Sequence, residues 1–462
     1  MPGKGTISID YIKTFVEKFS KYFRAHRFDN TETAVKYILG LLKCPKGEAN
    51  MERMEEEIDQ SEYRAYQQFI TNSTWDCEGL LESVAIETSE ILLSQKKENR
   101  MPIGYIIDES GHLKKGEKSV GVSRQYAGVA GKVDNCQVGV YASLVNGKHA
   151  SIINERIFLP ASWTTEKARC QEAGIPLECQ SFKTKPQLAA EMLKQDIARS
   201  VAFDWIGGDG LYGHSFELCK TIDEMNKFFV LDVHKDEKVF LEEPVFEVPE
   251  KKSKKGKTPE KLKPNVKDIR LDRIAEQIPE QDWHLEDIRH TVKGILKVKV
   301  YKINVWSWDG ESAKATRRTL IITQTADKTK YSFSNGQLSD YTHKEYGYFV
   351  CQRYWVERTF DNAKNELGMS DYQIRKWKSW HHHHSLVMLA SLFIMKQEID
   401  NHHQIPLLSF RDARILVILQ VFGSAKEVEK RLKQMKKRHI KRQADIDFNY
   451  RKQAEKAKNL SS

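Results

Sequence analysis

The sequence predicts an α/β protein built on a mixed sheet, with a helical region before the sheet and a basic helical region after it. Between residues 103 and 233, short apolar runs of strand length alternate with helix-like segments. Such alternation is typical of a sheet with helices on its faces. Helical spacing of apolar residues dominates 7–98, and a lysine- and arginine-rich helical pattern fills 425–462.

The N-terminal region is predicted to be a helical domain over residues 1–100. Its apolar residues recur at helical spacing, as in Ile12, Phe15, Phe19 and Tyr22. After a polar break, Trp75–Leu93 should form a helix with Thr74 as its N-cap. Such a domain suits DNA binding, and it suits packing equally well.

The central region supplies the predicted sheet. Its strands are expected at Tyr105–Asp108, Asn135–Leu144, Ala150–Ile157, Val201–Ile206 and Phe228–Val233, and its helices at Lys185–Ser200 and Ser215–Asn226. Asp108 ends the first apolar run, and Asp209 follows the fourth. Side chains at strand ends border the crevice in which α/β sheets bind ligands.

The rest of the chain is predicted to hold a β-rich insertion and a return to helices. Segments Lys297–Trp308, Arg318–Gln324 and Thr329–Phe333 alternate like strands, and 250–266 is a lysine-rich flexible loop. The predicted domains are therefore 1–100 helical, 101–235 first part of the core, 236–340 insertion, 341–400 second part of the core, and 401–462 basic and helical. Positions 425–458 carry 13 Lys/Arg against 5 Asp/Glu.

Composition narrows the function classes. The formal charge of +10 favours a polyanionic partner, although a basic enzyme without nucleic acid is equally compatible with that charge. The seven cysteines never occur in CxxC spacing, which indicates a reducing compartment. No apolar stretch has the length of a signal peptide core or a membrane span. Gly128–Lys132 is not a P-loop, so no nucleotide cofactor is expected.

Three carboxylates carry the predicted chemistry: Asp108, Asp209 and Glu357. Phosphodiester cleavage by two divalent cations needs a small set of oxygen ligands from different elements. On a helix, Arg353, Glu357 and Lys364 would form one stripe of cation, carboxylate and cation. That stripe suits a metal ligand flanked by phosphate contacts. A surface ladder of salt bridges is the alternative.

This combination resembles the RNase H-like DDE transposases of insertion sequences, in the retroviral-integrase-like superfamily. One branch has the signature Y-x2-R-x3-E-x6-K, and this chain matches all but the tyrosine, which is replaced by Val350 with Tyr348 two residues earlier. Longer stretches are also similar to one subgroup: Ile107–Gly111, Lys114–Gly116, Gly121–Tyr126, Asp134–Val138, Glu357–Gly368 and Trp377–His384.

The resemblance implies a core interrupted between the second Asp and the Glu, and the 147 residues from 210 to 356 leave room for the insertion. It implies cut-and-paste transposition in a bacterial, nucleoid-associated setting. Expected cofactors are two Mg²⁺ ions, with Mn²⁺ as a substitute. Expected partners are double-stranded transposon ends and target DNA, bound by a homodimer. The alternatives are an RNase H-like nuclease and a domesticated DNA-binding protein that does not transpose.

Further residues have a DNA-binding interpretation beside a structural one. Lys114, Lys115 and Arg124 follow the first Asp and suit contacts with the DNA backbone, or a solvated hairpin. Trp306 and Trp308 are predicted on one face of a strand, where they would stack on a base or pack together.

Four consecutive histidines, His381–His384, suggest metal binding at first sight. Adjacent helical positions diverge by about 100°, so no more than two could share an ion. Packing or contact with DNA is the preferred interpretation.

Overall fold

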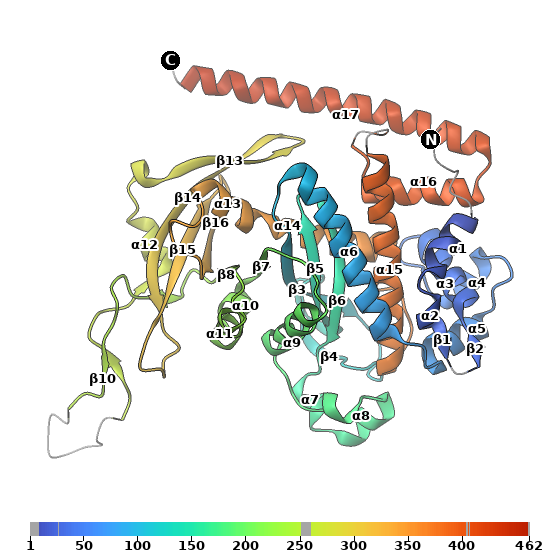
Figure 1. Ribbon diagram of the computed structural model, residues 1–462, viewed down its shortest axis with the longest axis horizontal. Helices are drawn as coiled ribbons and strands as arrows, with labels where there is room; N and C mark the ends of the chain where they lie inside the picture. The colour runs from blue at the N-terminus through green and yellow to red at the C-terminus, as the bar shows by residue number, and fades with distance from the viewer. Residues whose placement is uncertain (1–8, 26, 251–259, 403–404, 406, 461–462) are drawn as a thin grey trace. The chain divides into compact units, whose positions relative to one another are not determined.

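The computed structural model describes residues 9–25, 27–250, 260–402, 405 and 407–460 (Figure 1). The chain divides into two compact units. Unit 1 comprises Met1–Phe203 and Tyr354–Asp445, and unit 2 comprises Asp204–Arg353 and Ile446–Ser462. Both units are therefore discontinuous in sequence, and the larger segment of unit 2, Asp204–Arg353, is inserted between the two parts of unit 1.

The first part of unit 1 begins with helices and continues into a sheet. Its elements are α1 (Ile9–Glu17), α2 (Ser20–Phe23), β1 (Arg24–Ala25), β2 (Phe28–Asp29), α3 (Thr31–Lys43), α4 (Met51–Glu57), α5 (Tyr63–Gln67), the π-helix η1 (Gln68–Asn72), α6 (Cys77–Asn99), β3 (Gly104–Leu113), β4 (Ser123–Ala127), β5 (Lys132–Asn146), β6 (His149–Ile157), α7 (Ala161–Thr164), α8 (Lys167–Ala173), the 3-10 turn η2 (Leu177–Cys179) and α9 (Lys185–Ala198). The second part is helical: α14 (Tyr354–Glu366), α15 (Trp377–Asn401), α16 (Phe410–Phe422) and the start of α17 (Ala425–Leu460).

The sheet of unit 1 is organised around β5. This strand pairs antiparallel with β3 along one edge and with β4 and β6 along the other. From Cys136 to Val145 every residue of β5 is buried, which explains its predominantly apolar sequence. The core strand β3 begins where the sequence predicted, but it continues through Leu113. Asp108 consequently lies in the middle of the strand and not at its end.

Helix α15 is the buried helix of unit 1. It packs against α3, α6, α16 and β6, and every residue from Leu386 to Met395 is buried, so this part of the helix is enclosed on all sides. Helix α6 begins later than expected, because Asp76 is its N-cap and accepts a hydrogen bond from the Gly79 amide at 2.9 Å. The prediction of Thr74 as N-cap was therefore wrong.

Unit 2 is largely β-structure. Its elements are β7 (Trp205–Gly208), α10 (Gly210–Gly213), α11 (Phe216–Glu224), β8 (Phe229–Val233), β9 (Lys238–Val239), β10 (Phe246–Glu247), β11 (Lys263–Pro264), β12 (Ile269–Arg270), α12 (Leu271–Glu276), the 3-10 turn η3 (Glu280–Asp282), β13 (His284–Thr291), β14 (Gly294–Ser307), β15 (Thr316–Gln324), β16 (Thr329–Ser334), α13 (His343–Gln352) and the end of α17.

The strands that unit 2 contributes to the main sheet follow the order β13-β14-β15-β16-β8-β7, whereas β9 pairs with β12 and β10 with β11. Only the β7–β8 pair is parallel within this row, so the sheet is mixed, as predicted. The β-rich character expected for 236–340 is present. Of the lysine-rich loop, 251–259 lie outside the described residues, and Lys263–Pro264 pair with Phe246–Glu247.

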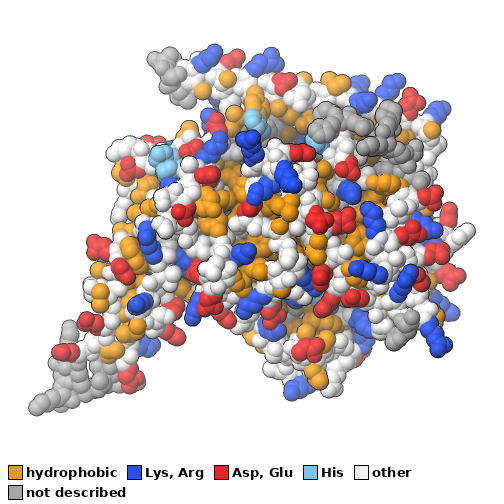
Figure 2. Space-filling model, viewed as in Figure 1, with side chains coloured by type: hydrophobic (Ala, Val, Ile, Leu, Met, Phe, Trp, Pro, Cys, Tyr) orange, Lys and Arg blue, Asp and Glu red, His pale blue; other side chains and the backbone are white. Residues whose placement is uncertain are grey.

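Helix α17 is less solvated than the sequence suggested. In unit 1, Met435 and His439 are buried, and the Arg438 guanidinium donates to the Asp412 carboxylate at 2.6 Å. In unit 2, the Gln453 side chain bonds to both the amide and the carbonyl of Ile295. Figure 2 shows Lys and Arg side chains spaced along the helix. Among the described residues, no helix has the length and apolar character of a membrane span.

Candidate active site

Asp108 projects from the middle of β3, on a face of the sheet that can be identified from its neighbours. It lies directly opposite Tyr141 of β5, and directly opposed residues of an antiparallel pair point to the same face. The Tyr141 ring contacts Phe360 of α14, with centroids 5.4 Å apart. Asp108 therefore projects toward the face that α14 covers. It is half-buried, and its Oδ1 accepts from the Glu109 amide at 2.8 Å.

Helix α14 carries Glu357 in its first turn and is held on the sheet by contacts further along. Phe360 packs on Tyr141, and the Lys364 ammonium donates to the carbonyl of Gly111 at 3.0 Å. Because Gly111 is three residues beyond Asp108, the helix follows β3 along its length. Glu357 is exposed. Within unit 1, Asp108 and the Glu357 helix thus share one face of the sheet.

Glu109 follows Asp108 directly in β3. One carboxylate oxygen of Glu109 lies within 4.8 Å of a carboxylate oxygen of Asp108, so the two acidic groups are close together. The Glu109 carboxylate pairs with the Lys185 ammonium of α9 at 2.8 Å.

A buried polar network lies on the Asp108 face four residues further along β3. His112 bonds to the hydroxyls of Ser370 and Tyr141 at 2.9 and 2.8 Å. Burial, followed by the charge of Lys364, holds the His112 pKa well below its usual range. Gly139 permits this arrangement, since an added Cβ would collide with the Tyr141 ring. His112 is therefore a neutral packing group beneath the site.

Asp209 belongs to unit 2 and follows β7, as the sequence predicted. It is half-buried and is the N-cap of the short helix α10, where its Oδ1 accepts from the Leu211 amide at 2.9 Å. The chain turns tightly here. The turn brings Gly213 so close to the carbonyl of Asp232 in β8 that an added Cβ would collide with it. The turn fixes the direction of the Asp209 side chain.

The predicted stripe of cation, carboxylate and cation is interrupted. Arg353 lies at the break between α13 and α14, and its Nε is 3.3 Å from the Asp232 carboxylate in unit 2. Glu357 and Lys364 are both in α14, where a spacing of seven residues keeps them on one side. Burial lowers the Lys364 pKa to about 8. The expectation that all three residues lie on one uninterrupted helix was wrong.

The cations predicted near the first Asp differ in their surroundings. The Lys114 ammonium lies 3.4 Å from the centroid of the Tyr372 ring and donates to the Tyr372 carbonyl at 2.9 Å. Burial lowers its pKa to about 7. Lys115 and Arg124 are exposed. The role of these three residues in DNA binding stays a prediction.

The two tryptophans of unit 2 are not equivalent. Trp306 is in β14 and exchanges backbone hydrogen bonds with Phe240, whereas Trp308 follows the end of the strand. Trp308 stacks on Phe246 with centroids 4.4 Å apart, and its indole N–H donates to the Ser312 carbonyl at 2.7 Å. The expected pair on one strand face was wrong, because the strand ends at Ser307.

The four histidines of α15 have separate partners within unit 1. His381 pairs with Glu155, His382 with the Ile70 carbonyl, His383 with the Tyr37 hydroxyl and His384 with the Trp380 carbonyl. Burial lowers the pKa values of His382 and His383 to about 3. These contacts match the packing interpretation. Sequence reasoning missed Glu155, which is fully buried and 226 residues from His381.

Comparison with known proteins identifies the family to which this chain belongs. The family model described as DDE superfamily endonuclease matches residues 15–295, and the chain belongs to this family. A relative is the probable transposase for insertion sequence element IS701 of Microchaete diplosiphon. It is 27% identical over 308 residues, which cover 66% of this chain and 67% of the relative.

These comparisons confirm the resemblance to insertion-sequence DDE transposases and the mixed α/β fold. The family match includes Asp108 and Asp209 but ends before Glu357. The assignment of Glu357 as a site residue therefore rests on its sequence motif and on its position in α14.

The donor set fits a hard divalent cation. Asp108 and Glu357 of unit 1 and Asp209 of unit 2 all offer carboxylate oxygens, the ligands that Mg²⁺ prefers. Asp108 is half-buried and Glu357 exposed, which leaves room for the waters that Mg²⁺ retains. Zinc prefers nitrogen and sulfur ligands, which none of these three residues provides.

Proposed function

We propose that this chain is a DNA transposase that cuts transposon ends and joins them to target DNA by cut-and-paste transposition. The supporting observation is the shared face of Asp108 and the Glu357 helix in unit 1, in a member of the DDE endonuclease family. The transposase title of the 27% identical relative supports the same assignment.

We propose Asp108, Asp209 and Glu357 as the ligands of two divalent cations, Mg²⁺ in the cell. Such ions, when bound, help to activate the attacking oxygen and to stabilise the leaving oxygen. Half-burial of Asp108 and Asp209 restricts their side chains. Glu357 sits on a helix anchored by Phe360 and Lys364. Prepositioned ligands of this kind lower the cost of organising the site during each turnover.

DNA is the proposed substrate, as transposon ends and as target, and the active assembly is proposed to be a homodimer. The exposed Lys115 and Arg124 of unit 1 and the basic helix α17 would contact phosphates. Neutralising each phosphate releases condensed counterions. Water would be the nucleophile in end cleavage, and the freed 3′-hydroxyl would attack target DNA.

Single replacements by alanine test the carboxylates. Asp108→Ala, Asp209→Ala and Glu357→Ala should each lower single-turnover cleavage of a pre-bound end by about 100-fold or more, since loss of a metal ligand removes several kcal/mol of stabilisation. DNA affinity should stay within about threefold, because phosphate contacts elsewhere dominate it. Asp361→Ala is the matched control, an exposed carboxylate one turn further along α14.

Retention of a tenth of wild-type cleavage by a variant would remove that residue from the set. Cleaved ends supplied to the wild-type protein with target plasmid separate transposition from simple nuclease activity. Joined products support the proposal, and hydrolysis alone would make the chain a nuclease. Absence of both activities with DNA affinity intact would favour a domesticated binding protein.

A further inference from the structure

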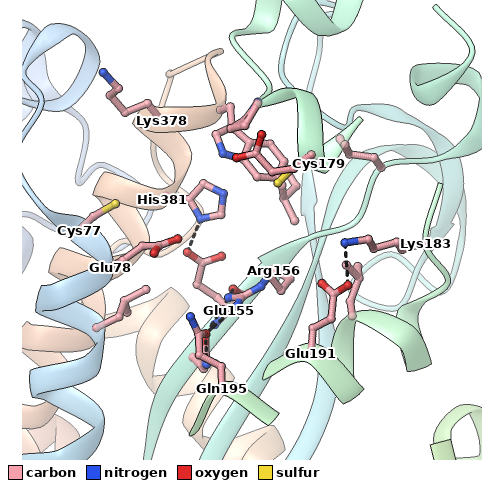
Figure 3. Close-up of a pocket in the computed structure, with 18 of the residues that line it drawn as sticks. Cys77, Glu78, Glu155, Arg156, Cys179, Lys183, Glu191, Gln195, Lys378 and His381 are labelled. Carbon is pink, nitrogen blue, oxygen red and sulfur yellow. Dashed lines mark hydrogen bonds and ion pairs between the residues drawn. The ribbon is translucent and has the colours of Figure 1, made fainter. Parts of the chain in front are cut away.

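A cavity of about 490 Å³ in unit 1 has walls of mixed charge (Figure 3). Acidic side chains such as Glu78 and Glu191 lie beside basic ones such as Arg156 and Lys378. Walls of both signs select neither an anionic nor a cationic ligand. A surface of unit 1 with a clearer chemical preference is the β4–β5 ribbon, the hairpin formed by residues 123–136.

The β4–β5 ribbon extends the sheet of unit 1 beyond the end of β3. Strand β3 ends opposite Cys136 of β5, whereas β5 begins at Lys132. Between these two residues β5 pairs with β4, and Tyr126 lies directly opposite Val133. A two-stranded ribbon therefore projects beyond the strand that carries Asp108.

One face of the ribbon continues the Asp108 face of the sheet. Gln137 of β5 lies opposite His112, which belongs to that face. Alternate residues of a strand share a face, and so do directly opposed residues of an antiparallel pair. Val133 and Tyr126 therefore point to the same side of unit 1 as Gln137.

Packing covers this face at Gln137 but leaves the ribbon exposed. The Tyr372 hydroxyl donates to Gln137 Oε1 at 2.9 Å. On the ribbon, Tyr126 is 65% exposed and Val133 is 54% exposed. Arg124, two residues before Tyr126 on the same face, is also exposed. Two exposed apolar side chains directly opposite each other, beside a cation, form a contact surface.

A second cation is held beside this surface by the loop that follows β3. Asn135 lies directly opposite Arg124. Its side-chain amide donates to the carbonyls of Lys114 and Gly116 at 2.8 and 2.9 Å. The loop that carries the exposed Lys115 is thereby fixed against the ribbon.

The acidic side chains near the ribbon do not reverse its charge. Asp134 points to the opposite face, and its carboxylate lies 3.4 Å from the Lys132 ammonium. Glu117 is exposed in the loop after β3. It is outnumbered by the exposed cations Lys115, Lys118 and Arg124. An apolar centre with a positive border matches the base edges and phosphates of DNA.

We propose that the β4–β5 ribbon lies in the major groove of the DNA end held at Asp108. Tyr126 and Val133 contact base edges, and Arg124 and Lys115 contact phosphates. The major groove is about 12 Å wide and admits a two-stranded β-ribbon, and apolar side chains recognise thymine methyl groups there. This inference rests on the proposed transposase function and adds a base-reading element to unit 1.

The strand register sets the distance between this contact and the cut. Tyr126 lies beyond Asp108 by five residues of β3, as far as Leu113, and by three further residues of β5. At about 3.3 Å per residue this is about 26 Å, or about eight base pairs of about 3.4 Å each. The contacted bases should therefore lie about five to ten base pairs from the scissile phosphate.

Dimethyl sulfate footprinting of the full-length protein tests the contact. The probe is a duplex that spans the element's end and its flanking DNA, without divalent cations, so that no cleavage is needed. The reagent methylates guanine N7 in the major groove and adenine N3 in the minor groove. Wild type should protect guanine N7 in the expected interval. Tyr126→Ala should lose this protection and bind at least about threefold more weakly, whereas Tyr126→Phe should retain both.

Charge variants test which face of the ribbon meets DNA. Arg124→Gln should lower the magnitude of the slope of log K against log salt by about 0.9. Lys132→Gln is the matched control, because it removes the same charge from the same hairpin but lies opposite the buried Ala127. An equal effect of the two variants would overturn the proposal.

Other outcomes separate this proposal from its rivals. Unchanged protection in Tyr126→Ala would overturn it, as would protection of adenine N3 alone, which would place DNA in the minor groove. Self-association of the DNA-free protein that Tyr126→Ala abolishes, with DNA binding unchanged, would overturn it in favour of a second copy of the chain. An intact footprint from a wild-type protein that does not cleave with Mg²⁺ would support the ribbon contact and contradict the proposed transposase function.

Discussion

At the scale of residues, two lysines predicted to contact DNA are bonded inside unit 1. Lys364 reaches the Gly111 carbonyl and Lys114 reaches the Tyr372 carbonyl. Both pay a desolvation cost, because burial lowers their pKa values to about 8 and about 7 from 10.5. Lys364 thereby positions the Glu357 helix on β3, a role that a phosphate contact would not require.

Replacing Lys364 by methionine should change how stability depends on pH. Between pH 8 and 10.5 the unfolded chain binds more protons at Lys364 than the folded chain, so the free energy of unfolding rises with pH in this window. Lys364→Met should remove up to about 3 kcal/mol of that rise. Denaturant unfolding at pH 7.5, 9 and 10 measures it, with the exposed Lys115→Met as control. If the unfolding free energy of Lys364→Met rose with pH as much as that of wild type, the lowered pKa of Lys364 would be contradicted.

At the scale of elements, local sequence patterns predicted the positions of most strands. The contacts between residues far apart in the sequence were not predictable from such patterns. Apolar runs identified β3, β5, β6 and β8 because buried strands need few polar residues. No local signal shows that Asp232 pairs with Arg353 where α13 ends, or that Glu155 pairs with His381 across 226 residues. The Asp108 face was likewise not predictable, since it depends on the register with β5.

The contact between α17 and the β13–β14 hairpin offers a test at this scale. The Ile295 amide donates to Gln453 Oε1 at 2.9 Å, and Gln453 Nε2 donates to the Ile295 carbonyl at 3.0 Å. Gln453→Ala should speed hydrogen exchange of the Ile295 amide about three- to tenfold, the range expected for one net hydrogen bond. Lys452→Ala, at the exposed neighbouring position, should leave it unchanged. Equal exchange in all three proteins would show that the contact does not persist in solution.

At the scale of the whole molecule, positive charge is concentrated in α17. Its buried contacts involve few residues, so most of its cations stay exposed, including Lys441, Arg442, Arg451 and Lys452. These are the groups expected to provide non-specific DNA affinity. Deleting 425–462 would also remove the contacts with Asp412 and Ile295, and neutralising exposed cations is therefore the cleaner experiment.

Changing those four residues to glutamine should flatten the dependence of log K on log salt. Each lost phosphate contact lowers the slope by about 0.9, so the magnitude should fall by up to about 3.6 on duplex DNA. Filter binding between 50 and about 300 mM salt measures the slope, and circular dichroism checks that helix content is retained. A slope equal to that of wild type would show that α17 does not touch DNA.

The discontinuity of unit 1 has a consequence for the nascent protein. When Phe203 has been made, β5 and β6 exist but α14 and α15, which pack on this sheet, do not. Ribosomes add about 5–20 residues per second, so the 150 residues of 204–353 delay these helices by about 8–30 seconds. During that interval the apolar surface that α15 later covers remains exposed to solvent. Messages truncated between the two parts of unit 1 should therefore yield chains that chaperones retain and proteases remove.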